Sequence, residues 1–341
     1  HSFHTTAEIP ERPVNRWMQE KMWEPQNKTQ PAYILPPIAN LSSGPSGLAY
    51  HPGTGFELGC KDQFLICDYR GGPAASGMWN FGIEPNGAGF AISESSKFSW
   101  GTAVTDVDWG YDGKLYVSDF ITGWKSHEAG RIYTITQPGV AEDPTANEVA
   151  ALFKKGFSTF DAQTLAGLLG HADMRVRLRA QYFLAGKKEA LALFTAAANQ
   201  NQNELERLHG VWGLGMLARK NNDNNATSFL ARLLNNKDAN VRGQAAQALG
   251  ESPLADSAIL LPLLKDESIR VRALTALALS RKPHPDATAE LLNILAENNN
   301  YDPYLRHAAT MALISCAGAD VIAALHSNES PAIRLAAVVA L

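Results

Sequence analysis

The sequence predicts two parts of different fold class, antiparallel β-structure up to residue 137 and an α-helical solenoid from residue 148 onward. The first part contains short β-branched and aromatic runs separated by Gly, Pro and Asp turns, a pattern typical of strands. In the second part Leu and Ala recur at helical spacing. Residues 138–147 connect the two parts and are interpreted as a linker, and 341 residues are enough for two such units.

Two sets of antiparallel strands are predicted in residues 1–137. The first set covers residues 46–50 and 62–68, and the second covers residues 103–109, 115–119 and 130–135. Asp112 and Gly113 form a strong hairpin signal, because Gly supplies the positive φ of a tight turn. Since three short strands followed by a fourth are typical of one blade of a β-propeller, we expect residues 1–137 to form part of a propeller, which the family resemblance described below identifies with its C-terminal blades.

A recurring motif, Asp-x-x-(apolar)-Arg-x-x-Ala, predicts stacked helix pairs of the HEAT-like kind in residues 148–341. Successive motif arginines are separated by 28 to 36 residues. The Asp is expected to cap the second helix of each pair, and the apolar residue and Ala are expected to pack inward. These residues are interpreted as structural, and the solenoid is expected to present a surface for a protein partner. The motif arginines are Arg177, Arg242, Arg270 and Arg306, with a variant at Arg334 and a degenerate copy at Arg207.

Composition and charge limit the function classes. The chain is 45% hydrophobic and 19% charged, which is ordinary for a globular protein. A formal charge of −4 gives no electrostatic basis for binding nucleic acid or an anionic membrane surface. Because no uninterrupted apolar run reaches 18 residues, we expect no membrane span.

The two ends of the sequence lack the usual boundary signals. The chain begins at His1 without a charged segment followed by an apolar stretch, the pattern of a signal peptide. It ends within an apolar helical run, residues 333–341, that has no Gly, Asn or Pro stop signal. We therefore expect a fragment of a longer protein, with the solenoid truncated at its C-terminus.

Several segments resemble a known family, namely residues 44–48, 68–72, 105–117 and 130–133, supported by residues 17–20 and 31–40. Together they resemble the last blades of soluble PQQ-dependent sugar-dehydrogenase-like propellers. The resemblance is closer to secreted bacterial proteins that join such a propeller to HEAT repeats and often to a c-type haem domain, the membrane-bound dehydrogenase or PVC-type haem-binding family.

This resemblance implies a periplasmic or extracellular oxidoreductase. Its propeller would bind or oxidise a carbohydrate or an alcohol and pass electrons to a haem domain outside this fragment, while the HEAT repeats would serve as a docking scaffold. The implied cofactors are PQQ with calcium, and a c-type haem is expected only outside this fragment, since no Cys-x-x-Cys-His motif occurs in it. No catalytic residue is assigned.

The candidate ligand-binding site is the end of a predicted strand and the Gly-rich loop after it. Arg70 stands where the resembled enzymes carry a cofactor-contacting lysine, and it would bind a carboxylate or sugar hydroxyls while Asp68 orients it. The alternative is an Asp–Arg pair that fixes a loop, with glycines that only satisfy turn geometry. The residues of this site are Asp68, Tyr69, Arg70, Gly71 and Gly72.

Asp106 and Asp108 form a weaker candidate, for a metal ion. Strand alternation places both side chains on one face, and carboxylates are preferred calcium ligands. The spacing fails the EF-hand pattern, because Gly110 stands at its fifth position and Val117 at its twelfth. Turn and strand-end roles are therefore favoured for these aspartates.

A second function hypothesis rests on two positions near the predicted cofactor site. The resembled enzymes carry two arginines there, whereas Ala103 and Thr105 occupy the matching positions of this chain. An anionic quinone needs cationic donors. These positions favour a non-catalytic carbohydrate- or protein-binding module with a HEAT interaction scaffold, so the sequence leaves open whether the protein is an enzyme.

Overall fold

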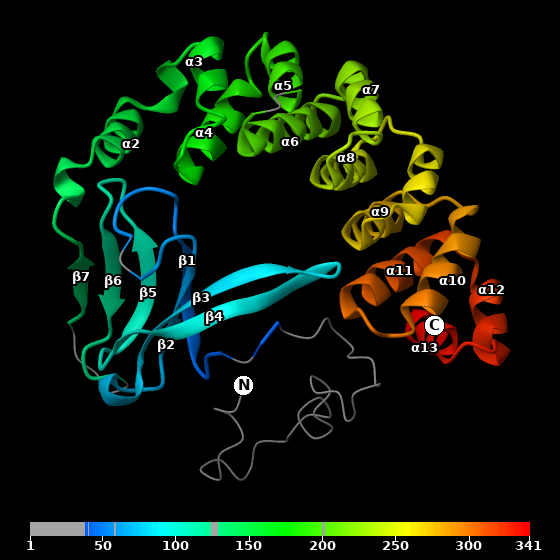
Figure 1. The fold of residues 1–341 in the computed structure, drawn as a ribbon, viewed down its shortest axis with the longest axis horizontal. Helices are drawn as coiled ribbons and strands as arrows, with labels where there is room; N and C mark the ends of the chain where they lie inside the picture. Colours follow the sequence, from blue (N-terminus) through cyan, green and yellow to red (C-terminus); the bar gives the residue numbers. More distant parts are fainter. Residues whose placement is uncertain (1–37, 40, 58, 124–128, 200–201) are drawn as a thin grey trace.

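The computed structural model describes residues 38–39, 41–57, 59–123, 129–199 and 202–341. Figure 1 shows two β-sheets, an arc of helices that starts beside them, and a long hairpin that runs from the sheets to the far part of the arc. Residues 17–20 and 31–37, which contribute to the family resemblance, lie outside the described residues. No described helix is long and apolar enough to cross a membrane.

The described strands form two antiparallel sheets. One sheet has the order β1-β2-β3-β4 and the other the order β5-β6-β7. The two sheets pack together where β1 lies against β5, over a core that includes Leu65, Met78, Val107 and Leu115. The strands are β1 (Pro45–Tyr50), β2 (Phe64–Asp68), β3 (Gly77–Asn86), β4 (Gly89–Trp100), β5 (Val104–Trp109), β6 (Leu115–Asp119) and β7 (Arg131–Ile135).

The prediction of propeller blades is wrong. The seven strands of the described part form two small open sheets, and these residues contain no closed propeller or barrel. Residues 46–50 and 62–68 belong to a four-stranded sheet whose other strands, β3 and β4, the sequence analysis missed. Strand alternation identifies single strands, whereas the number and arrangement of sheets depend on contacts between residues distant in sequence. Strand β4 was missed because its residues 93–97 are polar and exposed, so no apolar alternation marks that strand.

The helices form two layers along the arc. Figure 1 shows α4, α6, α8, α9 and α11 on its inner side, with α3, α5, α7 and α10 on its outer side. The helical-repeat fold is thus confirmed, and its first helix begins at Pro144, inside the predicted linker. The helices are α2 (Pro144–Lys155), α3 (Ala162–Gly167), α4 (Met174–Leu184), α5 (Ala190–Ala198), α6 (Glu204–Lys220), α7 (Asn224–Leu233), α8 (Ala239–Glu251), α9 (Ile269–Arg281), α10 (Ala287–Asn298), α11 (Pro303–Cys316), α12 (Ala319–Ala324) and α13 (Pro331–Ala340); 3₁₀ turns occupy Pro73–Ala75, Val140–Glu142, Phe157–Thr159, Ser257–Lys265 and Leu325–Ser327.

The predicted caps Asp173, Asp238 and Asp302 are confirmed, and two motif arginines form a ladder of ion pairs to the acidic residue of the next repeat. Each inner helix begins with a side chain that accepts a backbone N–H, and an arginine follows four residues after each cap. Arg207 donates to Asp238 at 2.6 Å, and Arg242 donates to Asp266 at 2.7 Å. The caps are Asp173, Asn203, Asp238, Ser268, Asp302 and, on α13, Ser330.

In α9 the predicted motif register is wrong by two residues. Ser268 caps this helix, so the arginine four residues after the cap is Arg272 rather than Arg270. Asp266 instead accepts two hydrogen bonds from Arg242 of the preceding inner helix. Arg270 is thereby free of the ladder and contacts the hairpin.

The tip of the β3–β4 hairpin closes the arc into a ring (Figure 1). Gly87, with a φ of +59°, provides the two-residue turn with the backbone geometry that it needs. The N–H of Ala88 donates to Oδ2 of Asp302 at 2.7 Å, and its carbonyl accepts from Nη1 of Arg270 at 3.2 Å. The guanidinium of Arg270 also lies 4.5 Å from the ring of Phe90. Ala88 belongs to the hydrophobic core of the solenoid, so the hairpin tip is part of both regions.

Candidate functional site

The structure brings Asp68 and Arg70 together, as the sequence predicted. Asp68 ends β2 and is fully buried. Its Oδ2 accepts from Nε of Arg70 at 3.0 Å and from Nε1 of Trp79 at 3.1 Å, while Oδ1 accepts from the N–H of Gly44 at 2.9 Å. Burial alone would raise the pKa of Asp68, but these hydrogen bonds outweigh it and hold the pKa at about 2. Asp68 is therefore a charged, fully engaged structural group.

The rest of this loop serves packing and backbone geometry. The ring of Tyr69 lies 6.2 Å from that of Phe120. Gly71 has a φ of +86°, which favours glycine, and the carbonyl of Gly71 leaves no room for a Cβ on Gly123. Beside Gly72 a Cβ would meet no atom within 4 Å. This geometry matches the alternative in which the Asp–Arg pair fixes a loop.

Arg70 is also covered on one side by an aromatic side chain. Its guanidinium carbon lies 5.7 Å from the ring of Trp100, and Nζ of Lys97 lies 4.3 Å from the same ring. Trp79 packs edge-on against Trp100, with ring centroids 5.5 Å apart. The cation–aromatic contacts and the bond to Asp68 hold Arg70 in place, and about a third of its side chain stays exposed.

Asp106 and Asp108 lie on the exposed face of β5, as alternation predicted. Oδ1 of Asp106 accepts from the N–H of Val107 at 2.9 Å, and Oδ1 of Asp108 accepts from that of Trp109 at 2.7 Å. Within the described ranges, no three His, Cys, Asp or Glu side chains come close enough to hold a metal ion. Two carboxylates alone supply too few oxygens for calcium, which takes six to eight.

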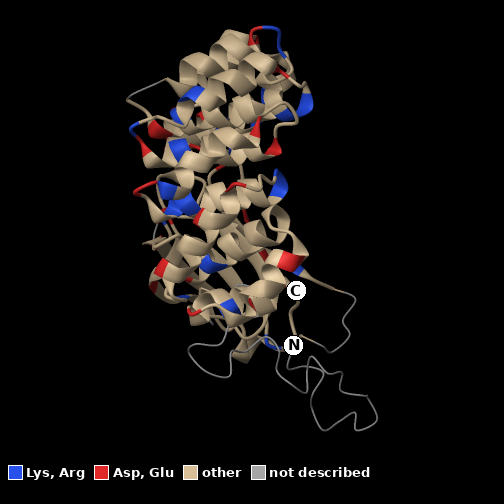
Figure 2. Cartoon of the chain, turned by 90° about the vertical axis from the view of Figure 1, so that its right-hand side faces the viewer, with Lys and Arg blue, Asp and Glu red and all other residues tan. Residues whose placement is uncertain are grey.

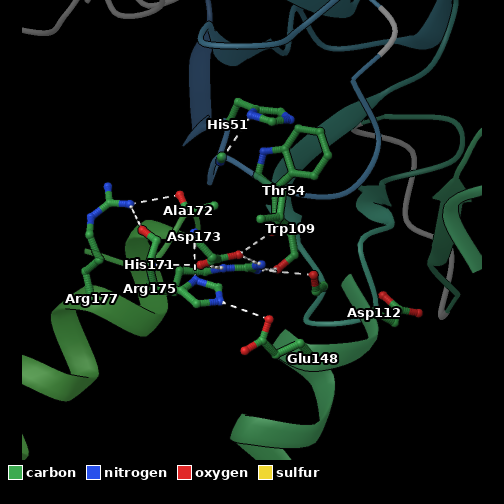
Figure 3. Close-up of polar contacts among 12 residues, drawn as sticks. His51, Thr54, Trp109, Asp112, Glu148, His171, Ala172, Asp173, Arg175 and Arg177 are labelled. Carbon is green, nitrogen blue, oxygen red and sulfur yellow. Dashed lines mark hydrogen bonds and ion pairs between the residues drawn. The ribbon is translucent and has the colours of Figure 1, made fainter. Parts of the chain in front are cut away.

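A buried network joins the sheets to the first inner helix (Figure 3). Asp173, fully buried at the cap of α4, accepts from Oγ1 of Thr54 at 2.6 Å and from Nη2 of Arg175 at 2.7 Å. Nη1 of Arg175 donates to the carbonyls of Trp109 at 2.7 Å and Gly110 at 3.1 Å. Burial alone would raise the pKa of Asp173, but the hydrogen bonds and charge of Arg175 outweigh it and lower the pKa. These bonds fix the sheets to the solenoid.

A second buried network extends this junction to the next helix pair. Arg177 donates to the carbonyls of His171 at 2.6 Å and Ala172 at 2.8 Å, and its Nε donates to Nε2 of His209 at 3.3 Å. Because Nε2 accepts, Nδ1 of His209 carries the proton and donates to Oε1 of Gln181 at 2.7 Å. Burial, helped by the charge of Arg177, lowers the pKa of His209 to about 4, so this histidine is neutral near pH 7.

The inner side of the arc carries a groove that the sequence analysis did not predict. It has a volume of about 280 Å³ and crosses three consecutive inner helices. Tyr182 and Trp212, two large aromatic residues of this groove, are 53% and 36% exposed. The groove is lined by Gln181, Tyr182, Trp212, Gly215, Met216, Arg219, Gln244, Gln247, Ala248 and Glu251.

The polar groups of this groove are amides and one ion pair. Nε1 of Trp212 donates to Oε1 of Gln244 at 2.8 Å, which links the indole ring of α6 to α8. Nη1 of Arg219 donates to Oε2 of Glu251, so the two charges compensate each other. The groove therefore combines aromatic surface with hydrogen-bonding groups and has no net charge from these residues.

A regular sequence signal marks this groove. Tyr182, Trp212 and Gln247 each lie nine residues after the cap of their helix, on the face opposite the outer layer. Counting from the caps would have placed these three side chains in one row. The repeat motif itself predicts only structural roles for its residues, so it does not reveal the row.

Comparisons with known proteins identify no family for this chain. No protein-family profile and no curated protein matches it. Among solved structures it is similar to YibA of Escherichia coli, with a TM-score of 0.42 and 22% identity over 56% of this chain and 73% of that one. It is also similar to an engineered protein, with a TM-score of 0.35 and 18% identity over 54% of this chain and 96% of that one.

Proposed function

We propose that this chain is a non-catalytic interaction scaffold whose inner helical surface binds a partner protein. The observation that supports the proposal best is the groove across α4, α6 and α8, where exposed Tyr182 and Trp212 lie beside Gln244 and Gln247. Aromatic rings supply large contact area at low entropic cost, and amides pair with peptide groups. The sheets and the hairpin hold the arc in one shape, which reduces the cost of binding.

The distribution of charge supports a protein partner over a nucleic acid. Figure 2 shows Lys and Arg interspersed with Asp and Glu on the side it presents, without a block of one sign. The formal charge of the whole chain is −4. A surface of this kind provides no continuous track for phosphates.

The enzymatic hypothesis is not part of this proposal. Arg70, the candidate cofactor contact, is engaged by the buried carboxylate of Asp68. An oxidoreductase activity with PQQ and calcium, a haem domain elsewhere in the protein and a periplasmic or extracellular location remain predictions from the family resemblance. The carbohydrate-binding alternative remains as well, because aromatic rings with amides also suit sugars.

A peptide display selection tests the proposal. The wild-type chain is used as bait for a random-peptide library, and selected peptides are measured by fluorescence anisotropy on wild type and on a Tyr182→Ser/Trp212→Ala double variant. We expect the double variant to bind at least about tenfold more weakly, because two aromatic contacts are lost. Tyr301→Ser is the matched control, since Tyr301 is 92% exposed and lies outside the groove.

Three outcomes decide between the hypotheses. Peptides that bind the control like wild type but lose affinity for the double variant support a protein-binding groove. No selected peptide, or equal binding by all three proteins, contradicts it. A glycan array that the wild type binds and the double variant does not would instead support the carbohydrate alternative.

A further inference from the structure

A second hollow lies on the junction of the sheets and α4. It has a volume of about 370 Å³ and is lined by β1, β5 and the first turn of α4. Leu48 and Tyr50 of β1 are 57% and 38% exposed there. Asp106 and Asp108 of β5 form its acidic side.

A row of exposed apolar side chains on α4 connects this hollow with the groove. Met174, which lines the hollow, is followed at intervals of four residues by Leu178 and by Tyr182, which lines the groove. Their exposed fractions are 37%, 41% and 53%. Residues four apart share one helix face, so the three side chains form a strip along α4. Contiguous exposed apolar surface of this kind is typical of an interaction site.

The spacing of this strip fits an extended polypeptide. Residues four apart on a helix are separated by about 6 Å along the axis, from a rise of about 1.5 Å per residue. Alternate residues of an extended chain are separated by about 6.6 Å. Side chains at every second position of such a chain would therefore meet Met174, Leu178 and Tyr182 in turn. Aliphatic Leu and Met contacts suit apolar side chains better than sugar hydroxyls.

The charge at one end of the strip favours a basic residue in the ligand. Asp106 and Asp108 are exposed, and each uses one carboxylate oxygen to accept the N–H of the next residue. Arg175, a cationic side chain that also lines the hollow, is engaged by Asp173 and by the carbonyls of Trp109 and Gly110. A Lys or Arg of the ligand would supply the missing positive charge.

We propose that the ligand surface runs from the groove along α4 to β1 and β5, and that it takes an extended partner segment with alternating apolar residues and a basic end. This inference rests on the proposed function and specifies its partner. The basic end lies at Asp106 and Asp108, and the apolar residues lie over Leu48, Met174, Leu178 and Tyr182.

Synthetic peptides of fixed design test the inference. The probe is a fluorescent Lys-Lys-Ser-Leu-Ser-Leu-Ser-Leu peptide, and a second Lys peptide has the same sequence reversed. Each of the two has a counterpart in which Glu replaces both Lys residues. Fluorescence anisotropy on the wild-type chain should give at least about tenfold tighter binding for one Lys peptide than for its Glu counterpart, with an advantage that falls as salt is raised. Equal binding of the Lys and Glu peptides overturns the inference.

Two variants with matched controls locate the site. Leu178→Ser should weaken the Lys peptide at least about tenfold, whereas Leu254→Ser, on the loop after α8, should not change it. Asp106→Asn/Asp108→Asn should remove most of the preference for Lys over Glu, whereas Asp320→Asn on α12 should retain it. All five substituted positions are exposed, so each variant is expected to fold, and circular dichroism checks this.

The outcomes also separate this inference from the proposed function. If peptides bind in a manner that depends on Trp212 but not on Leu178 or Asp106, the scaffold function stands and the extended surface is wrong. If neither Trp212 nor Leu178 affects the binding of any peptide, both are wrong.

Discussion

The β-region contacts the solenoid at two places, and each contact uses an arginine two residues after a helix cap. Arg175 on α4 donates to the carbonyl of Trp109 and lies 5.1 Å from the ring of Tyr111. Arg270 on α9 donates to the carbonyl of Ala88 and lies 4.5 Å from the ring of Phe90. The second position after the cap thus provides the same two contacts, one with a carbonyl and one with an aromatic ring, at both places where the β-region meets the solenoid.

The two contacts differ in how much else supports them. At the first, buried Asp173 joins Arg175 to Thr54, and the N–H of Met174 donates to the carbonyl of Pro52 at 2.8 Å. At the second, one residue of a hairpin turn, Ala88, makes the direct hydrogen bonds to the solenoid. The first contact is held by several hydrogen bonds and a buried ion pair, whereas the second has two hydrogen bonds and must also hold a long hairpin in place. We therefore expect the ring to open first at the hairpin tip.

The largest expected effect is at the first contact. Arg175→Met would leave the carboxylate of Asp173 buried without its cation, which costs about 3 kcal/mol in the free energy of unfolding. Denaturant titration followed by circular dichroism measures this loss. Arg179→Met, at an exposed position of the same helix, is the control. Equal stability of the two variants would show that the buried pair does not hold the junction.

A smaller effect concerns the pH dependence of the free energy of unfolding, which arises from His209 in the buried network next to the first contact. Burial and Arg177 lower the pKa of His209 to about 4 in the folded state, below the ordinary value of 6.5. The folded state then binds fewer protons than the unfolded state, so the stability is fully present above pH 6.5 and is lost as the pH falls towards 4. Between pH 7 and pH 5 this amounts to about 2 kcal/mol.

His209→Gln isolates this contribution, because Gln can still accept from Arg177 and donate to Gln181 without titrating. Denaturant titrations at pH 7, 6 and 5 should show a flatter pH dependence for the variant. Parallel curves for the two proteins would rule out His209 as the source of the slope.

The smallest expected effect is at the hairpin tip. Arg270→Met removes one hydrogen bond to Ala88 and the contact with Phe90, which costs about 1 kcal/mol. Hydrogen exchange of the amide of Ala88 should become about five times faster while amides of α4 stay unchanged. The control is Lys265→Met, whose side chain is 72% exposed. Unchanged exchange at Ala88 would mean that Asp302 alone retains the tip.

The hairpin and the groove show why part of the molecule could not be predicted. Helix caps such as Asp173 and Asp238 act within a few residues, so a sequence pattern reveals them directly. The hairpin tip is fixed instead by Asp302, 214 residues away, and the exposed polar run of residues 93–97 in β4 lacks apolar alternation. In the candidate site the pairing of Asp68 with Arg70 was predictable from their separation of two residues. To predict the row of Tyr182, Trp212 and Gln247, the position of each residue relative to its helix cap must be known. An error in a single cap, such as the one in α9, shifts every position counted from it.

The sequence by itself determined the division into a β-region and a helical-repeat region, the caps Asp173, Asp238 and Asp302 of three inner helices and the strands of the second sheet. These features depend on interactions between near neighbours in the chain, such as side-chain caps and the alternation of buried side chains. Only the tertiary structure decided that the sheets stay open, that the hairpin closes the ring and that the inner helices expose a groove. Those features depend on which distant surfaces meet, and local patterns do not encode that choice.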